Sequence, residues 1–378
     1  MRKTSFVLLL GLAACGGEEQ PAKGPENTAA KVETKPEVAQ PTTTAAPETP
    51  AAPKATLAEL QAKGLAATYE ALNAHDAKKL AALYTENATF KSAGAPDTTG
   101  SATIEKHVGM LFSSIPDLKV VPNFVFTTGD VTIVQYALNG THKGDMGPFK
   151  ASNKPVGWQA ATVQWWNEAG QIKEEHLYWD MNTMLSQIGV SKQKGPGVPT
   201  LGTKAEMFTA NGSEAETKNL ATLKGFYGAF EKKSAPDFLA VWGDASEWHD
   251  NTTEKVSKGS KDAKAYFEMN AKGFPDAKVT INNQWGIGDF VVTETTMTGT
   301  HKGTFMGIKP TGKAVNLQGV DIALVKDGKL VKGWSFGNSL QAAEQLGLLP
   351  KPGGETKPAG DKKPEAPKKA ETKPAPKK

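Results

Sequence analysis

The chain contains an internal repeat, and this repeat constrains the possible folds more than any other feature. Three motifs of the first half recur in the second half at a constant spacing of 159 residues. They are Pro-Asp at 116–117 and 275–276, Gly-Asp at 129–130 and 288–289, and Gly-Thr-His-Lys-Gly at 140–144 and 299–303. A solenoid unit is only about 20–45 residues long, so the repeat predicts two copies of a whole domain.

We place domain 1 at residues 57–190 and domain 2 at 216–349, with a linker over 191–215. Apolar residues at helical or alternating spacing predict the elements of domain 1. They are helices over 57–75, 77–84 and 104–112, a short strand near 88–90, strands over 119–126, 131–139, 156–166 and 171–179, and a closing helix over 181–188. Helices followed by antiparallel strands predict an α+β fold, which domain 2 repeats.

The regions outside the repeat differ in composition. Residues 16–56 contain seven prolines and no aromatic residue, and 350–378 are similar, while all eight tryptophans lie between the two segments. Such segments bury too little apolar surface to offset their ordering entropy, so we expect a disordered linker over 15–56 and a disordered tail over 350–378. The tail has nine lysines against four acidic residues, which accounts for the whole net charge of +4. A charge this small argues against a nucleic-acid partner.

The N-terminus resembles the signal peptide of bacterial lipoproteins. A basic start precedes a short apolar run over 6–12, and the string Leu-Ala-Ala-Cys at 12–15 is similar to a lipobox. The resemblance implies a signal peptide over 1–14, lipid on the sulfur of Cys15, and a lipid-anchored protein of the bacterial cell envelope. Gly16 in place of an aspartate favours the outer membrane. The alternative is an ordinary signal peptide with an incidental cysteine.

Several strings of domain 2 resemble the SnoaL-like ester cyclases of the NTF2-like superfamily. They are Phe-Pro-Asp at 274–276, Gly-Thr-His-Lys-Gly-Thr-Phe-Met-Gly-Ile-Lys-Pro-Thr-Gly-Lys at 299–313, Gly-Val-Asp-Ile at 319–322 and Asp-Gly-Lys at 327–329. The likeness covers all of domain 2 and, more weakly, domain 1. It implies tandem cone folds, each a curved antiparallel sheet wrapped on N-terminal helices around an apolar pocket.

The same resemblance bears on catalysis. In the polyketide cyclases the acid/base aspartate lies in the last strand, seven residues after the turn glycine. Counting from Gly170 gives Leu177, and counting from Gly328 gives Ser335. Both copies therefore lack the family's aspartate at this position, and neither leucine nor serine transfers a proton near neutral pH. Whether the chain is an enzyme therefore stays open.

Asp321 is the carboxylate that could substitute in domain 2. A two-residue turn at 327–328 would pair it with Trp334, whereas a three-residue bulged turn would pair it with Gly333. The sequence favours the bulged turn, which directs Asp321 into the pocket beside Gly319, Gly333 and Ser335. There it would have a raised pKa and act as a general base, unless it is a structural hydrogen-bond acceptor.

Domain 1 carries different polar groups on the same scaffold. Thr162 takes the place of Asp321, and the nearest pocket carboxylate is Glu175, a second candidate base. Strand alternation places Trp158, Leu177 and Trp179 on the pocket face, where two indoles would narrow the cavity or bind a planar apolar ligand. Glycines in domain 2 predict a larger pocket.

Histidines give a weaker signal. His249 lies in an aromatic-His segment that ester cyclases often place near the pocket mouth, but its neighbour Asp250 points to the opposite face of a strand, which argues against a His–Asp dyad. His142 and His301, in the repeated Gly-Thr-His-Lys-Gly motif, more often bind backbone than substrate. No His-x-x-x-His or related spacing supports a metal site.

Three functions remain after this reading. The first is a binding module that holds a small apolar ligand in one or both pockets without a cofactor. The second is an ester-cyclase or isomerase-type enzyme with Asp321 as base. The third is a structural or protein-interaction module of the envelope, in which sheets pair between the two domains or in a homodimer.

Overall fold

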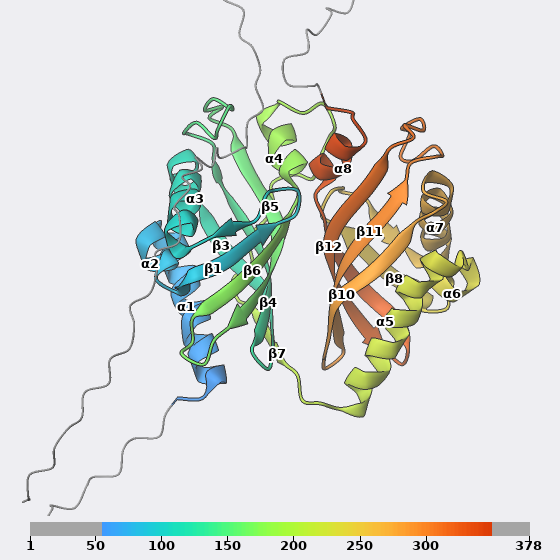
Figure 1. Cartoon of the computed structure of the whole chain (residues 1–378), viewed down its shortest axis with the longest axis horizontal. Helices are drawn as coiled ribbons and strands as arrows, with labels where there is room; N and C mark the ends of the chain where they lie inside the picture. Colours follow the sequence, from blue (N-terminus) through green and yellow to red (C-terminus); the bar gives the residue numbers. More distant parts are fainter. Residues whose placement is uncertain (1–54, 350–378) are drawn as a thin grey trace, which may run out of the picture.

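The computed structural model describes residues 55–349 (Figure 1). It contains two mixed sheets with helices, one sheet for each repeat, and the predicted α+β fold is confirmed. The signal peptide over 1–14, Cys15, almost all of the 15–56 linker and the tail over 350–378 lie outside the described residues. Within the described part, no helix is both long and apolar enough to span a membrane.

Domain 1 has a sheet in the order β2-β1-β6-β5-β4-β3-β7. Its elements are α1 (Leu57–Ala74), α2 (Ala77–Ala81), β1 (Tyr84–Ser92), β2 (Thr98–Thr99), α3 (Ser101–Ser114), β3 (Lys119–Thr128), β4 (Val131–Thr141), β5 (Pro155–Trp166), β6 (Ile172–Trp179), α4 (Met181–Ile188) and β7 (Glu206–Thr209). Two sequence expectations were wrong here. The helix expected over 77–84 ends at Ala81, because Tyr84 already pairs with Ile172 as the first residue of β1. The sheet is not wholly antiparallel, since β1 pairs with β6 and β3 with β7 in parallel.

Domain 2 repeats this plan in the order β10-β11-β12-β13-β8-β9. Its elements are α5 (Glu214–Lys232), α6 (Ala235–Leu239), β8 (Trp242–Asp250), β9 (Val256–Lys258), α7 (Gly259–Gly273), β10 (Lys278–Ile287), β11 (Phe290–Thr300), β12 (Ala314–Lys326), β13 (Lys329–Phe336) and α8 (Ser339–Gln345). The sheet of domain 2 lacks a counterpart of β7, which comes from the segment expected to be a linker.

The first helix of each domain begins in the same way. Thr56 and Ser213 each cap a helix, and a glutamate three residues later returns the hydrogen bond to the capping residue's backbone. This capping box satisfies N–H groups that a helix start otherwise leaves unpaired. The capping residues Thr56 and Ser213 therefore determine where α1 and α5 begin.

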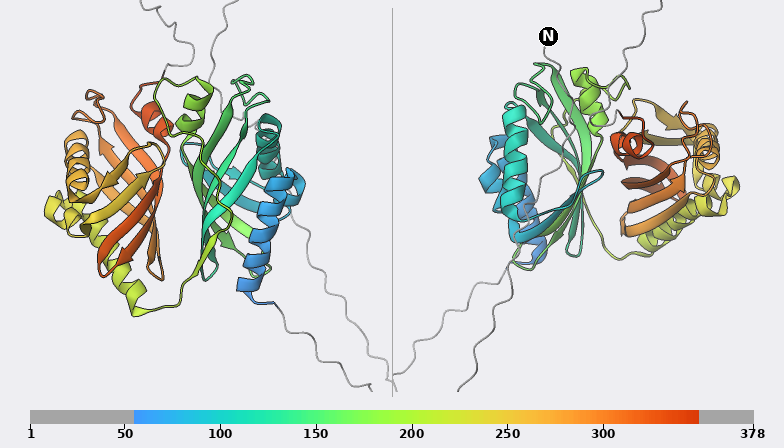
Figure 2. Two further views of the ribbon diagram at one scale, coloured as in Figure 1. Left: turned by 180° about the vertical axis from the view of Figure 1, so that it is seen from behind. Right: turned by 45° about the horizontal axis from the view of Figure 1, so that its top comes forward.

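Each sheet has two apolar faces. The inner face packs on the helices of its own domain, as Leu223 and Phe226 of α5 do against Val291 and Ala323. The outer faces of the two sheets pack on each other and form one core cluster that includes Ile133 and Ile322. Figures 1 and 2 show the sheets facing each other, with α1–α3 and α5–α7 on the far sides and with α4 and α8 next to each other at one end. The two sheets of one chain thus pack face to face across the domain boundary.

Candidate functional site

Asp321 reaches the inner face of domain 2 by a route that the sequence did not predict. The turn is a two-residue one, since Lys326 pairs with Lys329 and both Asp327 and Gly328 have positive φ. The expected bulged turn was therefore wrong. A bulge at Val331 instead shifts the register by one residue, so Asp321 lies opposite Ser335 rather than Gly333. Because a one-residue shift exchanges the two faces, Asp321 still points inward.

The surroundings of Asp321 change its acidity. The Tyr227 hydroxyl on α5 donates a 2.7 Å hydrogen bond to Asp321 Oδ2. Burial raises the pKa of Asp321 to about 6, while hydrogen bonds from Tyr227 and Ser335 oppose the rise and the charge of Asp250 adds to it. A carboxyl group with this pKa is mostly ionised at neutral pH and can exchange a proton there. Burial also raises the pKa of Tyr227 well above its usual value, so Tyr227 remains a hydrogen-bond donor.

Asp250 is a second interior carboxyl group, which the sequence did not indicate as a site residue. Parallel pairing of β8 with β13 places Asp250 beside Ser335, on the side of β13 opposite to Asp321. Burial raises its pKa, against hydrogen bonds from the Thr252 hydroxyl and backbone. No local motif signals this arrangement, because the two strands are far apart in sequence.

The inner surface of domain 2 is open near Asp321. Gly319 and Gly337 take the places of Ala160 and Trp179 in domain 1, and both glycines are partly exposed. A Cβ added at Gly337 would meet nothing within 4 Å. The inner face of domain 2 therefore has free space beside Gly337.

Gly333 does not contribute to this opening. The ring of Trp248 on β8 occupies the space where a Gly333 side chain would lie, and Trp248 also stacks on Phe226 with ring centroids 6.0 Å apart. The space expected at this glycine is thus filled by the neighbouring strand. The accessible part of the interior is confined to the region of Gly319, Asp321 and Gly337.

Domain 1 is filled where domain 2 is open. Trp158 and Trp179 stack with centroids 4.8 Å apart, and Leu177 packs against the same cluster. Glu175 is 6 % exposed and accepts hydrogen bonds from the Tyr84 hydroxyl at 2.6 Å and Gln164 Nε2 at 2.8 Å. Burial raises its pKa in spite of these bonds. Both hydrogen bonds reach Oε2 of Glu175 and hold this carboxyl group within the filled interior.

The remaining candidates are histidines. His249 is on the outer face of β8, where it stacks on Trp334 and contacts Glu247. Burial and the nearby charge of Lys332 lower its pKa, which leaves the ring neutral near pH 7. His142 and His301 are fully buried; Nδ1 of each contacts a hydroxyl group, that of Ser152 or Thr311, while Nε2 has no hydrogen-bond partner among the described residues. Among residues 55–349, no cluster of three or more His, Cys, Asp or Glu side chains could hold a metal ion.

These features define a class of protein: tandem α+β cones joined through their sheets, with one interior open and one filled. The chain belongs to the SnoaL-like polyketide cyclase family, whose model matches residues 63–188 and 221–346. No curated protein matches it.

Solved structures similar to this chain each correspond to about one third of it. AclR of Streptomyces galilaeus is 26% identical and covers 36% of this chain and 99% of its own, with a TM-score of 0.33. TsrD of Streptomyces laurentii is 21% identical and covers 37% of this chain and 100% of its own, with a TM-score of 0.33. IdmH of Streptomyces antibioticus is 23% identical and covers 34% and 98%, with a TM-score of 0.31.

Proposed function

We propose that domain 2 binds a small, mainly apolar molecule in its interior, and that the filled interior of domain 1 has a structural role. The observation that carries the proposal is the difference between equivalent positions: Trp179 stacks on Trp158 in domain 1, whereas Gly337 faces open space. Asp321 and its hydrogen-bond donors Tyr227 and Ser335 supply polar groups beside the apolar cluster around Phe226. Apolar walls with a few polar groups are the usual composition of a small-molecule site.

The test transfers the domain 1 side chain to domain 2. In Gly337→Trp the indole fills the open space, and we expect binding of 1-octanol, measured by calorimetry, to weaken at least tenfold. Gly225→Trp is the matched control, because Gly225 lies on the exposed side of α5 and its substitution leaves the interior unchanged. Equal octanol affinity in the wild type and Gly337→Trp would exclude a ligand site at this position.

A second candidate is proton transfer by Asp321. It is supported by the pKa of about 6 and by the Tyr227 contact. The ionised carboxylate would take a proton from a carbon next to a carbonyl group, and the electron pair of the C–H bond would move onto the carbonyl oxygen. We expect the wild type to accelerate deuterium exchange at the α-carbon of cyclohexanone and Asp321→Asn not to. Exchange at the same rate in both proteins would exclude proton transfer by Asp321 and leave ligand binding as the only proposed function of domain 2.

We also propose that the chain is a lipoprotein anchored through Cys15 in the bacterial envelope, with Gly16 favouring the outer membrane. The support is the Leu-Ala-Ala-Cys string after a short apolar run. The wild type is expected to partition with membranes and Cys15→Ala with the soluble fraction. Membrane partitioning of Cys15→Ala would contradict the anchor.

A further inference from the structure

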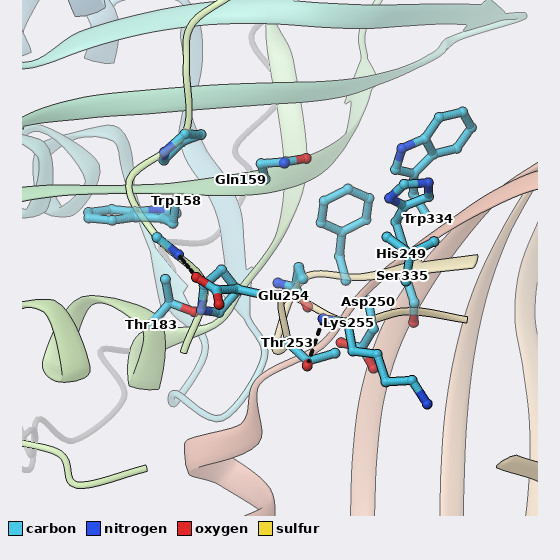
Figure 3. Close-up of a pocket in the computed structure, with 16 residues that line it drawn as sticks. Trp158, Gln159, Thr183, His249, Asp250, Thr253, Glu254, Lys255, Trp334 and Ser335 are labelled. Carbon is cyan, nitrogen blue, oxygen red and sulfur yellow. Dashed lines mark hydrogen bonds between the residues drawn. The ribbon is translucent and has the colours of Figure 1, made fainter. Parts of the chain in front are cut away.

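A cavity of about 180 Å³ lies between the two domains (Figure 3). Trp158 and Gln159 line it from domain 1, and His249, Asp250 and Trp334 line it from domain 2. A linker segment closes one side: Glu254 accepts hydrogen bonds from Lys194 Nζ at 3.0 Å and from the Gly197 backbone N–H at 3.2 Å. The cavity therefore exists only because the two domains are joined in this arrangement.

This cavity shares residues with the interior of domain 2. Asp250 and Ser335 line the cavity, and they are also neighbours across β8 and β13 on the inner face. Asp321 is the next residue on that face, opposite Ser335 across β12 and β13. Ser335 therefore lies between the cavity and Asp321.

The walls of the cavity offer hydrogen bonds of both kinds. Gln159 is exposed toward domain 2 and uses its Oε1 to accept from Gln135, which leaves its amide nitrogen as a donor. The neutral ring of His249 donates from Nε2 to Glu247 at 3.3 Å, which leaves Nδ1 as an acceptor. Lys194 pairs with Glu254, and Lys255 lies 4.0 Å from Asp262, so the charges of Glu254 and Lys255 both have partners. Indole rings supply the apolar part of the walls. Hydroxyl groups, which donate and accept, suit such a lining better than an ion does.

We propose that the inter-domain cavity binds an uncharged, hydroxyl-rich head group, such as a sugar or polyol, of a ligand whose apolar part enters domain 2. The inference rests on the proposed function of domain 2 and makes its ligand amphipathic. It also assigns domain 1 a part in ligand selection, because Trp158 and Gln159 form one wall of the head-group site.

The experiment compares two probes with the same alkyl chain, 1-octanol and octyl glucoside below its micelle concentration, by calorimetry on the full chain. We expect the wild type to bind octyl glucoside about tenfold more tightly, which corresponds to about 1.4 kcal/mol. In Gln159→Trp the indole fills the cavity, so this preference disappears while octanol affinity is unchanged. Gln318→Trp, at the equivalent position of domain 2 and outside the cavity, is the control that retains the preference. Gln159→Leu removes the amide donor with little change in size and should reduce the preference if Gln159→Trp fails to fold.

The outcomes separate the two proposals. Equal affinity of the wild type for both probes, or an undiminished preference in folded Gln159→Trp, would overturn the head-group site and leave the apolar site standing. Failure of the wild type to bind either probe would overturn both proposals.

Discussion

The contact between the two domains gives a prediction with a defined pH dependence. Glu294 of β11 is 1 % exposed and accepts hydrogen bonds from two residues of domain 1, the Tyr178 hydroxyl at 2.8 Å and His176 Nδ1 at 2.7 Å. Asn283 of domain 2 donates a third at 2.7 Å. His176 also contacts Glu174 at 2.9 Å, so its ring lies between two carboxylates.

The perturbation is Glu294→Gln, which keeps the shape but turns an NH2 group toward donors. Hydrogen bonds to charged groups contribute about 1.5–3 kcal/mol each, roughly twice the value of neutral ones. Losing the charge on three such bonds should lower the free energy of unfolding by about 2–4 kcal/mol at pH 6.

The sign of the pH dependence follows from His176. Burial alone would lower the pKa of His176, but the hydrogen bonds and charge of Glu294, with the bond to Glu174, raise it above the usual value, against a small effect of Lys91. A raised folded pKa adds stability that is complete below about pH 6.5 and is lost as pH rises through the folded pKa. The difference between the wild type and Glu294→Gln should therefore be smaller at pH 9 than at pH 6.

The assay is urea unfolding followed by tryptophan fluorescence at both pH values. Glu254→Gln is the control, because its ion pair with Lys194 is largely exposed and should contribute less than about 1 kcal/mol at either pH. An equal loss for Glu294→Gln at pH 6 and pH 9 would refute the role assigned to charged His176. A loss below about 0.5 kcal/mol at both would refute any stabilisation by this contact.

Three further predictions concern single positions. Gly225→Ala should raise the free energy of unfolding by about 0.5–1 kcal/mol, because Gly225 is exposed within α5 and a Cβ there meets nothing; an unchanged or lower value in urea unfolding would contradict this. Gly303→Ala should lower it by about 1–3 kcal/mol, since its Cβ would overlap the Lys272 backbone carbonyl, and a neutral result in the same assay would refute that close approach. The carboxyl of Asp321 should titrate near pH 6 by NMR. A carboxyl pKa that is higher in the folded than in the unfolded state costs stability as pH rises from about 3.9 to about 6, so the stability of Asp321→Asn relative to the wild type should increase over this range and stay constant above it; a pKa near 3.9 would exclude both effects.

The sequence by itself determined the features that depend on local patterns. The constant spacing of Gly-Thr-His-Lys-Gly motifs gave two copies of one domain, and the alternation of strand residues gave Trp158 and Trp179 a common face, where they stack. The capping boxes at Thr56 and Ser213 set the first helix of each copy. Such signals depend only on residues that are close in sequence, so they can be recognised without knowledge of the tertiary contacts.

Only the tertiary structure decided which interior is open and which polar groups meet. Asp250 adjoins Ser335 because β8 pairs with a strand more than eighty residues away, and the bulge at Val331 reverses the face that the turn alone would give Asp321. Trp248 fills the space at Gly333 for the same non-local reason. The cavity between the domains depends on the pairing of two sheets. Strand register and sheet packing bring together segments that are distant in sequence. Local periodicity cannot predict them, because their energy comes from contacts between those segments.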